Sequence, residues 1–335
     1  MRDARLLFPS LLRMLAAFGL GAAVALAGSG HAAAQSPAPA QAKPRPVKPP
    51  PQARRKPKTP ALTFDYLGAK PDTSRRPYSA AIASQHINTL SLDIAALTAV
   101  GIAVGAGQWG WGQSNFHFTK EGWFGRNTTY GGMDKLGHAY SAQLMSDYIT
   151  WRLRAAGYDS GESSVTAALL TGIAFAGVEF GDGFSHYGAS YEDFIASASG
   201  IAFSYLRNTV PGLYGKVDFR MQYVPKMSGD FLGVGDYDGK KFLLAWKLGG
   251  FETFKETPLR YLEIYTGYYA RGFGPHTGNV PQTRSAYVGL GLNLTELLFS
   301  QPGTRDTTIG SAIAVFNRYI QLPFTYVASD GNSGR

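Results

Sequence analysis

The sequence predicts an α+β fold, in which a four-helix bundle rich in small residues precedes an antiparallel meander of four or five strands. Four segments of helical length lie between residues 90 and 212 and are rich in Ala, Gly, Ser and Thr. Beyond Lys216, apolar residues alternate with polar residues and glycines, which is the period of a strand. Composition divides the chain into a signal peptide (1–34), a basic Pro-rich linker (35–61), a helical bundle (62–215) and a β-rich C-terminal region (216–335).

The N-terminal residues have the three-part pattern of a secretory signal peptide. Arginines accompany an apolar run over 15–27 and the small-residue sequence HAAAQ at 31–35, which predicts cleavage after Ala34. A membrane anchor is the alternative, although this apolar run is shorter than the ~20 residues that a spanning helix needs. With either segment the chain leaves the cytoplasm. It contains no cysteine, so we expect neither disulfides nor a lipid-modified cysteine, and any membrane attachment has to come from the fold.

Residues 35–61 contain nine prolines, seven Lys or Arg and no acid. Such a segment cannot bury apolar surface, and we expect a solvated linker with polyproline II character. It is a spacer, or its charge holds it to an anionic envelope polymer or to lipid headgroups. Residues 1–61 hold ten of the 32 Lys and Arg and one of the 23 acids, which leaves 22 of each sign in residues 62–335. The folded part is neutral, so no nucleic-acid partner is expected.

Four apolar segments are predicted to be helices, and each has few charges in its middle. They cover 90–107, 134–157, 162–183 and 190–212. Small residues let helix backbones approach closely, as in membrane bundles, but each apolar stretch has only 13 to 18 residues and is marginal for a full crossing. A bundle in or against a membrane and a compact soluble bundle both fit this composition.

The segment 107–132, between the first two helices, is rich in glycine and aromatic residues and holds three of the five tryptophans. Such rings are enriched at membrane interfaces. We expect this segment either to lie at such an interface or to form a packed lid over the bundle.

Four segments beyond Lys216 are predicted to be strands. They cover 240–250, 260–273, 285–294 and 309–327, the last being one strand or two strands broken at Pro323. An outer-membrane barrel formed by one chain needs at least eight strands. A channel would therefore require several chains, and a meander packed on the helices is the favoured arrangement.

Polar side chains mark the ends of three predicted helices, and several recur at spacings of three or four residues, which place them on one helix face. These residues are Asp134, Lys135, His138, Glu179, Asp182, Asp193 and Ser197. If the helices bundle with these ends together, the side chains converge at one level, as in sites built between facing helices.

His138, Glu179 and Asp193 are the candidates for chemistry. Imidazole and carboxylate groups together can hold a divalent metal ion, which would lower the pKa of a bound water. Without a metal, a carboxylate could orient His138 as a general base. The candidate binding residues around them are Asp134, Lys135, Asp182 and Ser197.

Structural roles are the alternative for several of these residues. Asp134 could be the N-cap of its helix, and Ser190 with Asp193 resembles a capping box. Lys135 could be a solvated surface charge. For Glu179 a functional or networked role is favoured, because a carboxylate at the end of an apolar helix needs a partner.

Three stretches of the chain resemble the YfiM-like family of periplasmic lipoproteins, whose function is unknown. They are MDKLGHAYSA (133–142), GVEFGDGFS (177–185) and SYEDFIASASG (190–200). The order Asp-Lys-x-x-His, Glu, Asp is also similar, more distantly, to VanZ-like membrane proteins, which have Asn at the position of Ser197. The resemblance implies an exported envelope protein, but lipid anchoring cannot be carried over without a cysteine.

These observations predict an exported cell-envelope protein, in the periplasm or the outer membrane of a Gram-negative bacterium. We expect a membrane-associated structural or lipid-interacting component whose helices enclose a polar network, with membrane lipid or an envelope polymer as partner. The alternative is a metal-assisted hydrolase that acts on an envelope lipid or its headgroup, with His138, Glu179 and Asp193 as metal ligands or base.

Overall fold

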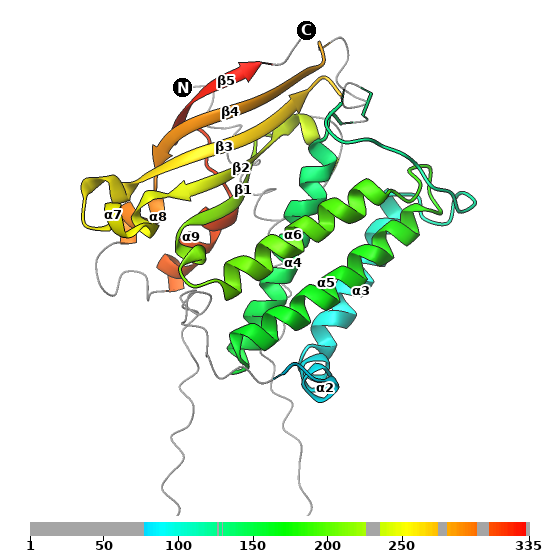
Figure 1. Cartoon of the computed structure of the whole chain (residues 1–335). Coiled ribbons are helices and arrows are strands. Elements are labelled where there is room, and N and C mark those ends of the chain that lie inside the picture. Colours follow the sequence, from blue (N-terminus) through cyan, green and yellow to red (C-terminus); the bar gives the residue numbers. More distant parts are fainter. Residues whose placement is uncertain are drawn as a thin grey trace, which may run out of the picture.

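The structure is a computed structural model that describes residues 77–125, 127–128, 130–225, 235–273, 280–299 and 308–332. The expected signal peptide (1–34) and linker (35–61) lie outside these ranges. Helices dominate the first part of the described chain, and an antiparallel sheet dominates the second (Figure 1). The predicted mixture of helices followed by strands is therefore confirmed.

All four predicted helices are present, and a shorter one precedes them. They are α2 (Ala80–Thr89), α3 (Ser91–Gln108), α4 (Met133–Ala155), α5 (Ser160–Asp182) and α6 (Tyr191–Thr209). Helix α2 is not among the predicted helices, because its sequence AAIASQHINT has no clear apolar period. It begins after Ser79, whose hydroxyl accepts the amide of Ile82 as an N-cap.

Helices α4, α5 and α6 pack against one another, whereas α3 lies on the outside along α5 (Figure 1). An ion pair fixes the start of α3, because the carboxylate of Asp93 accepts hydrogen bonds from Nε and Nη2 of Arg152 on α4, each at 3.0 Å. The arrangement is thus three closely packed helices with a fourth beside them, rather than an even bundle of four.

Helices α5 and α6 bury polar side chains and expose apolar ones. Their buried polar residues are Ser160, Ser163, Ser164, Thr166, Thr171, Glu179, Glu192, Asp193, Ser197, Ser204, Arg207 and Asn208. Their exposed apolar residues include Leu169, Ile173, Phe180, Phe194, Ile195 and Leu206. The apolar stripe of a surface helix in a water-soluble protein faces the core, so this distribution is inverted. By length and composition, α3 and α5 could also cross a membrane.

The sheet is an antiparallel meander with the strand order β1-β2-β3-β4-β5 (Figure 1). Its strands are β1 (Val217–Tyr223), β2 (Lys240–Lys247), β3 (Leu262–Arg271), β4 (Thr283–Leu292) and β5 (Tyr326–Asn332). Strands β2 and β3 fall within predicted segments, and β4 begins two residues before the segment predicted at 285–294. Strand β1 does not, because its sequence VDFRMQY contains two charged residues, Asp218 and Arg220, that the fold nevertheless buries.

The prediction of strands over 309–327 is wrong for most of that segment. Residues Thr308–Tyr319 form helix α9, and only the end of the segment, from Tyr326, enters β5. Helix α9 buries Ser311, Ala314 and Asn317, which are spaced by three residues. Two of these three are polar, so the helical spacing is not visible as an apolar pattern. Short helices and 3-10 turns link the other elements: η2 (Leu213–Gly215), η3 (Tyr237–Gly239), η4 (Leu248–Gly250), α7 (Glu252–Lys255), η5 (Pro258–Tyr261) and α8 (Leu294–Phe299).

Aromatic packing joins the helices to the near edge of the sheet. The ring of Tyr140 on α4 contacts Phe219 of β1 and Phe242 of β2, and the ring centroids are 5.7 Å apart in both pairs. Met133 at the start of α4 is fully buried in the same core. Strands β1 and β2 therefore pack directly on α4, and β3, β4 and β5 follow outward from them (Figure 1).

Buried ion pairs reinforce this junction. The guanidinium of Arg207 on α6 lies 3.3 Å from a carboxylate oxygen of Asp147 on α4 and 2.8 Å from one of Asp218 on β1. On the sheet, Arg220 of β1 pairs with Asp218 at 2.9 Å and with Glu263 of β3 at 2.6 Å. The chain of pairs runs from α4 through α6 and β1 to β3, so the helices and strands share one charged interior.

Helices α4 and α6 approach so closely that one position at their crossing has room only for glycine. A Cβ atom on Gly200 of α6 would collide with the main-chain carbonyl of Ala139 on α4. We predict that Gly200→Ala lowers the free energy of unfolding by about 1–3 kcal/mol, the usual effect of overpacking. Thermal unfolding of the purified protein, followed by circular dichroism, measures this change.

Gly172→Ala is the matched control, because a Cβ atom on Gly172 of α5 would meet nothing within 4 Å. It should be neutral or should stabilise the protein by up to about 1 kcal/mol through helix propensity. Equal stability of the Gly200→Ala variant and the original protein would contradict the close approach of α4 and α6.

Candidate functional site

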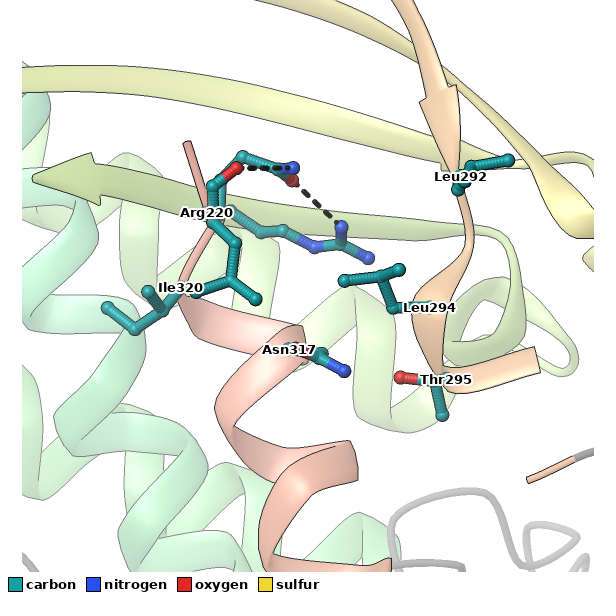
Figure 2. A pocket seen from close by; sticks show the side chains of 8 residues that line it. Arg220, Leu292, Leu294, Thr295, Asn317 and Ile320 are labelled. Atoms are coloured by element: carbon teal, nitrogen blue, oxygen red, sulfur yellow. Dashed lines mark hydrogen bonds between the residues drawn. The ribbon is translucent and has the colours of Figure 1, made fainter. Parts of the chain in front are cut away.

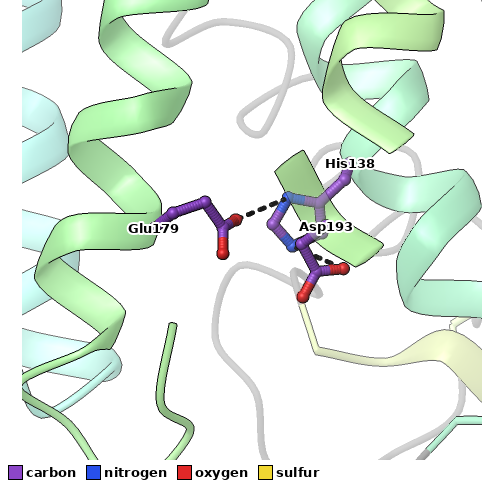
Figure 3. A group of neighbouring side chains, drawn as sticks. All are labelled: His138, Glu179 and Asp193. Carbon is purple, nitrogen blue, oxygen red and sulfur yellow. Dashed lines mark ion pairs between the residues drawn. The ribbon is translucent and has the colours of Figure 1, made fainter. Parts of the chain in front are cut away.

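The ends of three helices bring His138, Glu179 and Asp193 together (Figure 3). His138 lies in the second turn of α4, Glu179 in the last turn of α5, and Asp193 in the first turn of α6. Nδ1 of His138 is 3.7 Å from Oε1 of Glu179, and Nε2 is 3.7 Å from Oδ1 of Asp193. The side chain of His138 is 20% exposed, so the imidazole lies between two buried carboxylates and stays accessible.

The start of α6 fixes the positions of both carboxylates. Ser190 is the N-cap, and its hydroxyl accepts the amide of Asp193 at 3.3 Å, as the capping-box pattern predicts. In a complete capping box the side chain at the Asp193 position accepts the amide of the N-cap residue. Here that amide donates instead to Oε2 of Glu179 at 3.1 Å. The carboxylate of Asp193 is therefore directed toward His138 and Lys135.

The alternative role of Asp134 as an N-cap is wrong. Helix α4 begins at Met133, and its N-cap is Gly132, which adopts a φ of 86° that favours glycine. Because the helix starts one residue earlier than the sequence indicates, Asp134 lies inside the first turn. Its carboxylate there accepts a 2.8 Å hydrogen bond from Nζ of Lys135.

Lys135 lies at the centre of a second group of carboxylates. It is only 2% exposed, so the alternative role as a solvated surface charge is wrong. Its Nζ lies 2.7 Å from Oδ1 of Asp193 and also pairs with Glu121 and Asp134. These three carboxylates could hold a cation by distance, and the ammonium group of Lys135 already lies among them. Sequence patterns do not reveal Glu121, because it lies in an irregular segment with no fixed spacing to the helices.

The two groups share Asp193 and contain more acids than bases. The ammonium group of Lys135 and the imidazole of His138 face four carboxylates, which belong to Glu121, Asp134, Glu179 and Asp193. Burial raises the pKa of Glu121 to about 8, and the carboxylate of Asp193 adds to this rise while Lys135 opposes it. Glu121 therefore holds its proton at neutral pH, which reduces the excess of negative charge.

Ser197 and Asp182, the two other predicted residues, lie in different places relative to the imidazole. Oγ of Ser197 is 3.5 Å from Nδ1 of His138, at the outer limit of a hydrogen bond. Asp182 instead accepts a 2.7 Å hydrogen bond from the indole of Trp111. Asp182 thus ties the segment before α4 to the end of α5.

The aromatic segment 107–132 is partly packed and partly exposed. The indole of Trp111 lies against Gly105 of α3 and Gly181 of α5, where any Cβ atom would collide with the ring. Phe118 is 80% exposed, and Trp123 is also exposed. Trp111 is packed between helices, as expected for a lid. The alternative, a membrane interface, stays a prediction for the exposed rings.

His138, Glu179 and Asp193 can each direct one ligand atom to a common point. These atoms lie within 4.8 Å of one another. Ligands about 2.1 Å from a tetrahedral zinc ion are roughly 3.4 Å apart. The two 3.7 Å separations start at different nitrogens of His138, of which only one can bind a given ion, so the side chains have to move to hold an ion between them. Oε1 of Glu179 is buried and has no hydrogen-bond partner among the described residues, which makes it available to a ligand.

A small pocket lies elsewhere, beside β1, α8 and α9 (Figure 2). Its polar lining consists of Arg220, Thr295, Asn317 and Gln321, and aliphatic side chains form the rest. The guanidinium of Arg220 is already bonded to Glu263 and Gln321. Its charge therefore serves the ion pairs that join the strands.

Both groups of carboxylates fall within one region of sequence similarity. Residues 120–209 match the family described as "Predicted periplasmic lipoprotein (DUF2279)". The DUF2279 match contains every residue of the two groups, from Glu121 to Asp193, and it ends at the end of α6. No curated protein and no solved structure matches the chain.

The DUF2279 match confirms the predicted location: the protein is exported to the periplasm or the outer membrane. It agrees with the resemblance to a periplasmic lipoprotein family of unknown function, whereas the distant similarity to VanZ-like proteins stays a prediction. The 335 residues contain no cysteine that could carry the lipid of a lipoprotein.

Glu121 gives the site a pH dependence whose sign follows from the pKa values. The folded protein binds this proton with a pKa of about 8, against an ordinary value of 4.5. The stability that this proton contributes is complete below about pH 4.5 and is lost as the pH rises through about 8. We predict that Glu121→Gln, which stays neutral at every pH, flattens the decline of the melting temperature over this range.

Glu252→Gln is the matched control, because the side chain of Glu252 is 88% exposed. Its melting temperature should follow that of the original protein at each pH. If the Glu121→Gln variant also keeps the original pH dependence, Glu121 is not the group that binds the proton.

Proposed function

We propose that the chain is an exported envelope protein whose helices lie in a membrane and enclose a polar site. The observation that carries this proposal is the inverted distribution on α5 and α6, where polar side chains are buried and apolar ones exposed. In water each large apolar side chain left exposed forgoes about 1.5–3 kcal/mol of burial free energy. In hydrocarbon the exposed apolar side chains forgo no burial free energy, and the polar groups have to find partners inside the protein.

The lengths of α3 and α5 support a membrane location. Helix α3 has 18 residues and α5 has 23, which at 1.5 Å per residue give about 27 and 35 Å against a hydrocarbon core of about 30 Å. Only 11% of the apolar stretch of α3 and 28% of that of α5 is buried inside the protein. The core helix of a soluble protein would be mostly buried, so lipid is the better solvent for these two helices.

The polar site then acts as an internal network that holds the helix ends together. Lys135 and His138 provide partners for Asp193, and His138 and the amide of Ser190 provide them for Glu179. We propose a structural or lipid-interacting role for this unit, with membrane lipid or an envelope polymer as partner. The basic linker (35–61) would meet anionic polymer or lipid headgroups through its seven Lys and Arg.

Ile173→Asp tests the membrane location, because Ile173 lies near the middle of α5 and is 70% exposed. A carboxylate in the middle of a membrane helix costs about 2.5–3.5 kcal/mol. We predict that the variant is depleted from the membrane fraction of cells, whereas the original chain stays in the membrane pellet after extraction with alkaline carbonate.

Leu259→Asp is the matched control, since Leu259 is an exposed apolar residue of the turn η5, outside the helices. It should reach the membrane fraction at nearly the original level. Release of the original chain by carbonate, with no effect of Ile173→Asp, would contradict the proposed location.

A second candidate function is metal-assisted hydrolysis of an envelope lipid or its headgroup. The observation that favours it is the convergence of ligand atoms from His138, Glu179 and Asp193, together with Oε1 of Glu179, which accepts no hydrogen bond from the described residues. A divalent ion at this point would offset the excess of buried carboxylates and would lower the pKa of a bound water. Ser197, at 3.5 Å from Nδ1, would help to orient the imidazole of His138.

We predict that the purified full chain retains about one zinc or manganese ion after dialysis, because three protein ligands suffice for a site with an open position. Elemental mass spectrometry measures the ion, and a rise in melting temperature on adding the metal measures its binding. Glu179→Gln and His138→Ala should abolish both signals.

His186→Ala is the control, because His186 is an exposed histidine outside the group. The absence of a bound ion and of any thermal shift would contradict the metal site and leave the structural role. A bound ion without hydrolysis of envelope phospholipid would contradict the hydrolase and support a structural site.

A further inference from the structure

Strand β4 has the reverse of the burial pattern expected in water. It buries Ser285, Tyr287, Gly289 and Gly291, and it exposes Ala286, Val288, Leu290 and Leu292. An antiparallel sheet with one face in water places its apolar side chains on the core side and its polar ones outside. The apolar side of β4 is therefore the side that faces away from the protein interior.

The exposed apolar side chains continue across the sheet in register. One residue from each of β2, β3, β4 and β5 forms a row: Trp246, Ile264, Leu290 and Val327. All four are exposed, and the exposed fraction reaches 74% for Val327. Together with Val288 and Leu292 of β4, this row is the outer face of the sheet.

The opposite side of the same strands carries charge and tyrosine. Glu263 of β3 is fully buried and accepts hydrogen bonds from both Nη atoms of Arg220, at 2.6 and 2.8 Å. The ring of Tyr265 lies over Gly291, where a Cβ atom would be 2.6 Å from the ring. This side cannot turn outward without breaking its ion pairs, so the apolar side has to face outward.

The outer face continues the surface on which α4 packs. Phe242 lies four residues before Trp246 on β2, hence on the same side of the sheet, and its ring contacts Tyr140 of α4. Helices cover this side at β1 and β2, whereas β3, β4 and β5 extend beyond them (Figure 1). One apolar surface is thus partly covered by the helices and partly left to another occupant.

The dimensions of the outer face fit lipid hydrocarbon. Strands β3 and β4 have 10 residues each, and strands that cross a membrane have about 9–11. From Ala286 to Leu292, about 20 Å at ~3.4 Å per residue, the exposed side chains of β4 are uncharged. Charged groups stand at both ends: Arg284 donates to the carbonyl of Phe124 at one end, and Arg260 lies in the turn before β3 at the other.

We infer that lipid acyl chains cover the outer face of the sheet, so that this face lies against the same membrane as the helices. This inference rests on the proposed membrane location of the helices and adds the sheet to it. A surface recognised by a soluble protein has an apolar core with a polar rim around it. A long uncharged band between charged ends is typical instead of a surface in lipid.

The experiment uses spin labels, because a chain without cysteine accepts a label at one chosen position. The variants are Leu290→Cys on the outer face, Val288→Cys as a second position there, Ile173→Cys on α5 and Glu252→Cys in α7. Each full-length variant is reconstituted into vesicles of phosphatidylethanolamine and phosphatidylglycerol, after circular dichroism shows the original helix content. Electron paramagnetic resonance then compares collisions with oxygen, which concentrates in hydrocarbon, and with a water-soluble nickel complex.

Labels at positions 288 and 290 should favour oxygen over nickel several-fold more than the label at 252 does, and about as much as the label at 173. Nickel access at 288 and 290 with lipid contact at 173 would overturn this inference and leave the proposed function. Nickel access at all of them would overturn both. Broadening between labels at 290 that persists when lipid dilutes the protein would identify a second copy as the occupant and would also overturn the inference.

Discussion

The ion pairs of Arg207 are the interaction on which the remaining arrangement depends. This guanidinium is buried between Asp147 of α4 and Asp218 of β1, and removal of one partner from a buried pair typically destabilises a protein by about 3–5 kcal/mol. Because Arg207 belongs to α6, the contact fixes two helices and the first strand at once. The positions of the helix ends that hold His138 depend on this contact, as do the positions of the strands that follow β1. The shared interior can be polar because its buried charges form ion pairs with one another.

Much of the helical half could be predicted from the sequence, because its signals are local. Four apolar segments with few internal charges gave the helices, and Ser190 marked the start of α6. Polar residues at the ends of three consecutive helices were expected to converge. In the structure, the carboxylates of Glu179 and Asp193 each lie 3.7 Å from the imidazole of His138. Short connections between α4, α5 and α6 make neighbouring helices antiparallel, which places alternate ends at the same level.

The features that sequence patterns missed are those in which the buried side chains are polar. Strand β1 buries Asp218 and Arg220, and α9 buries Ser311 and Asn317, so neither shows the apolar period by which strands and helices are recognised. Glu121 reaches Lys135 from an irregular segment that the contact of Trp111 with α3 and α5 helps to position. Its place depends on packing between distant parts of the chain, and no spacing in the sequence encodes that.

The last helix completes the polar interior of the first part of the chain, and this sets an order for folding. The hydroxyl of Tyr319 donates to Asp147 at 2.9 Å across 172 residues, and the hydroxyl of Tyr140 donates to the carbonyl of Tyr319 across 179. Contacts between residues so far apart form late, because a long loop has to close first. The region matched by the DUF2279 family supplies Ser204, Arg207 and Asn208 to Asp147, and the bond from Tyr319 is added only after residues near 319 have been exported. Completion of this interior therefore follows translocation of the residues near 319, and a fragment limited to 120–209 would lack the hydroxyl of Tyr319 and the pairing of Arg207 with Asp218.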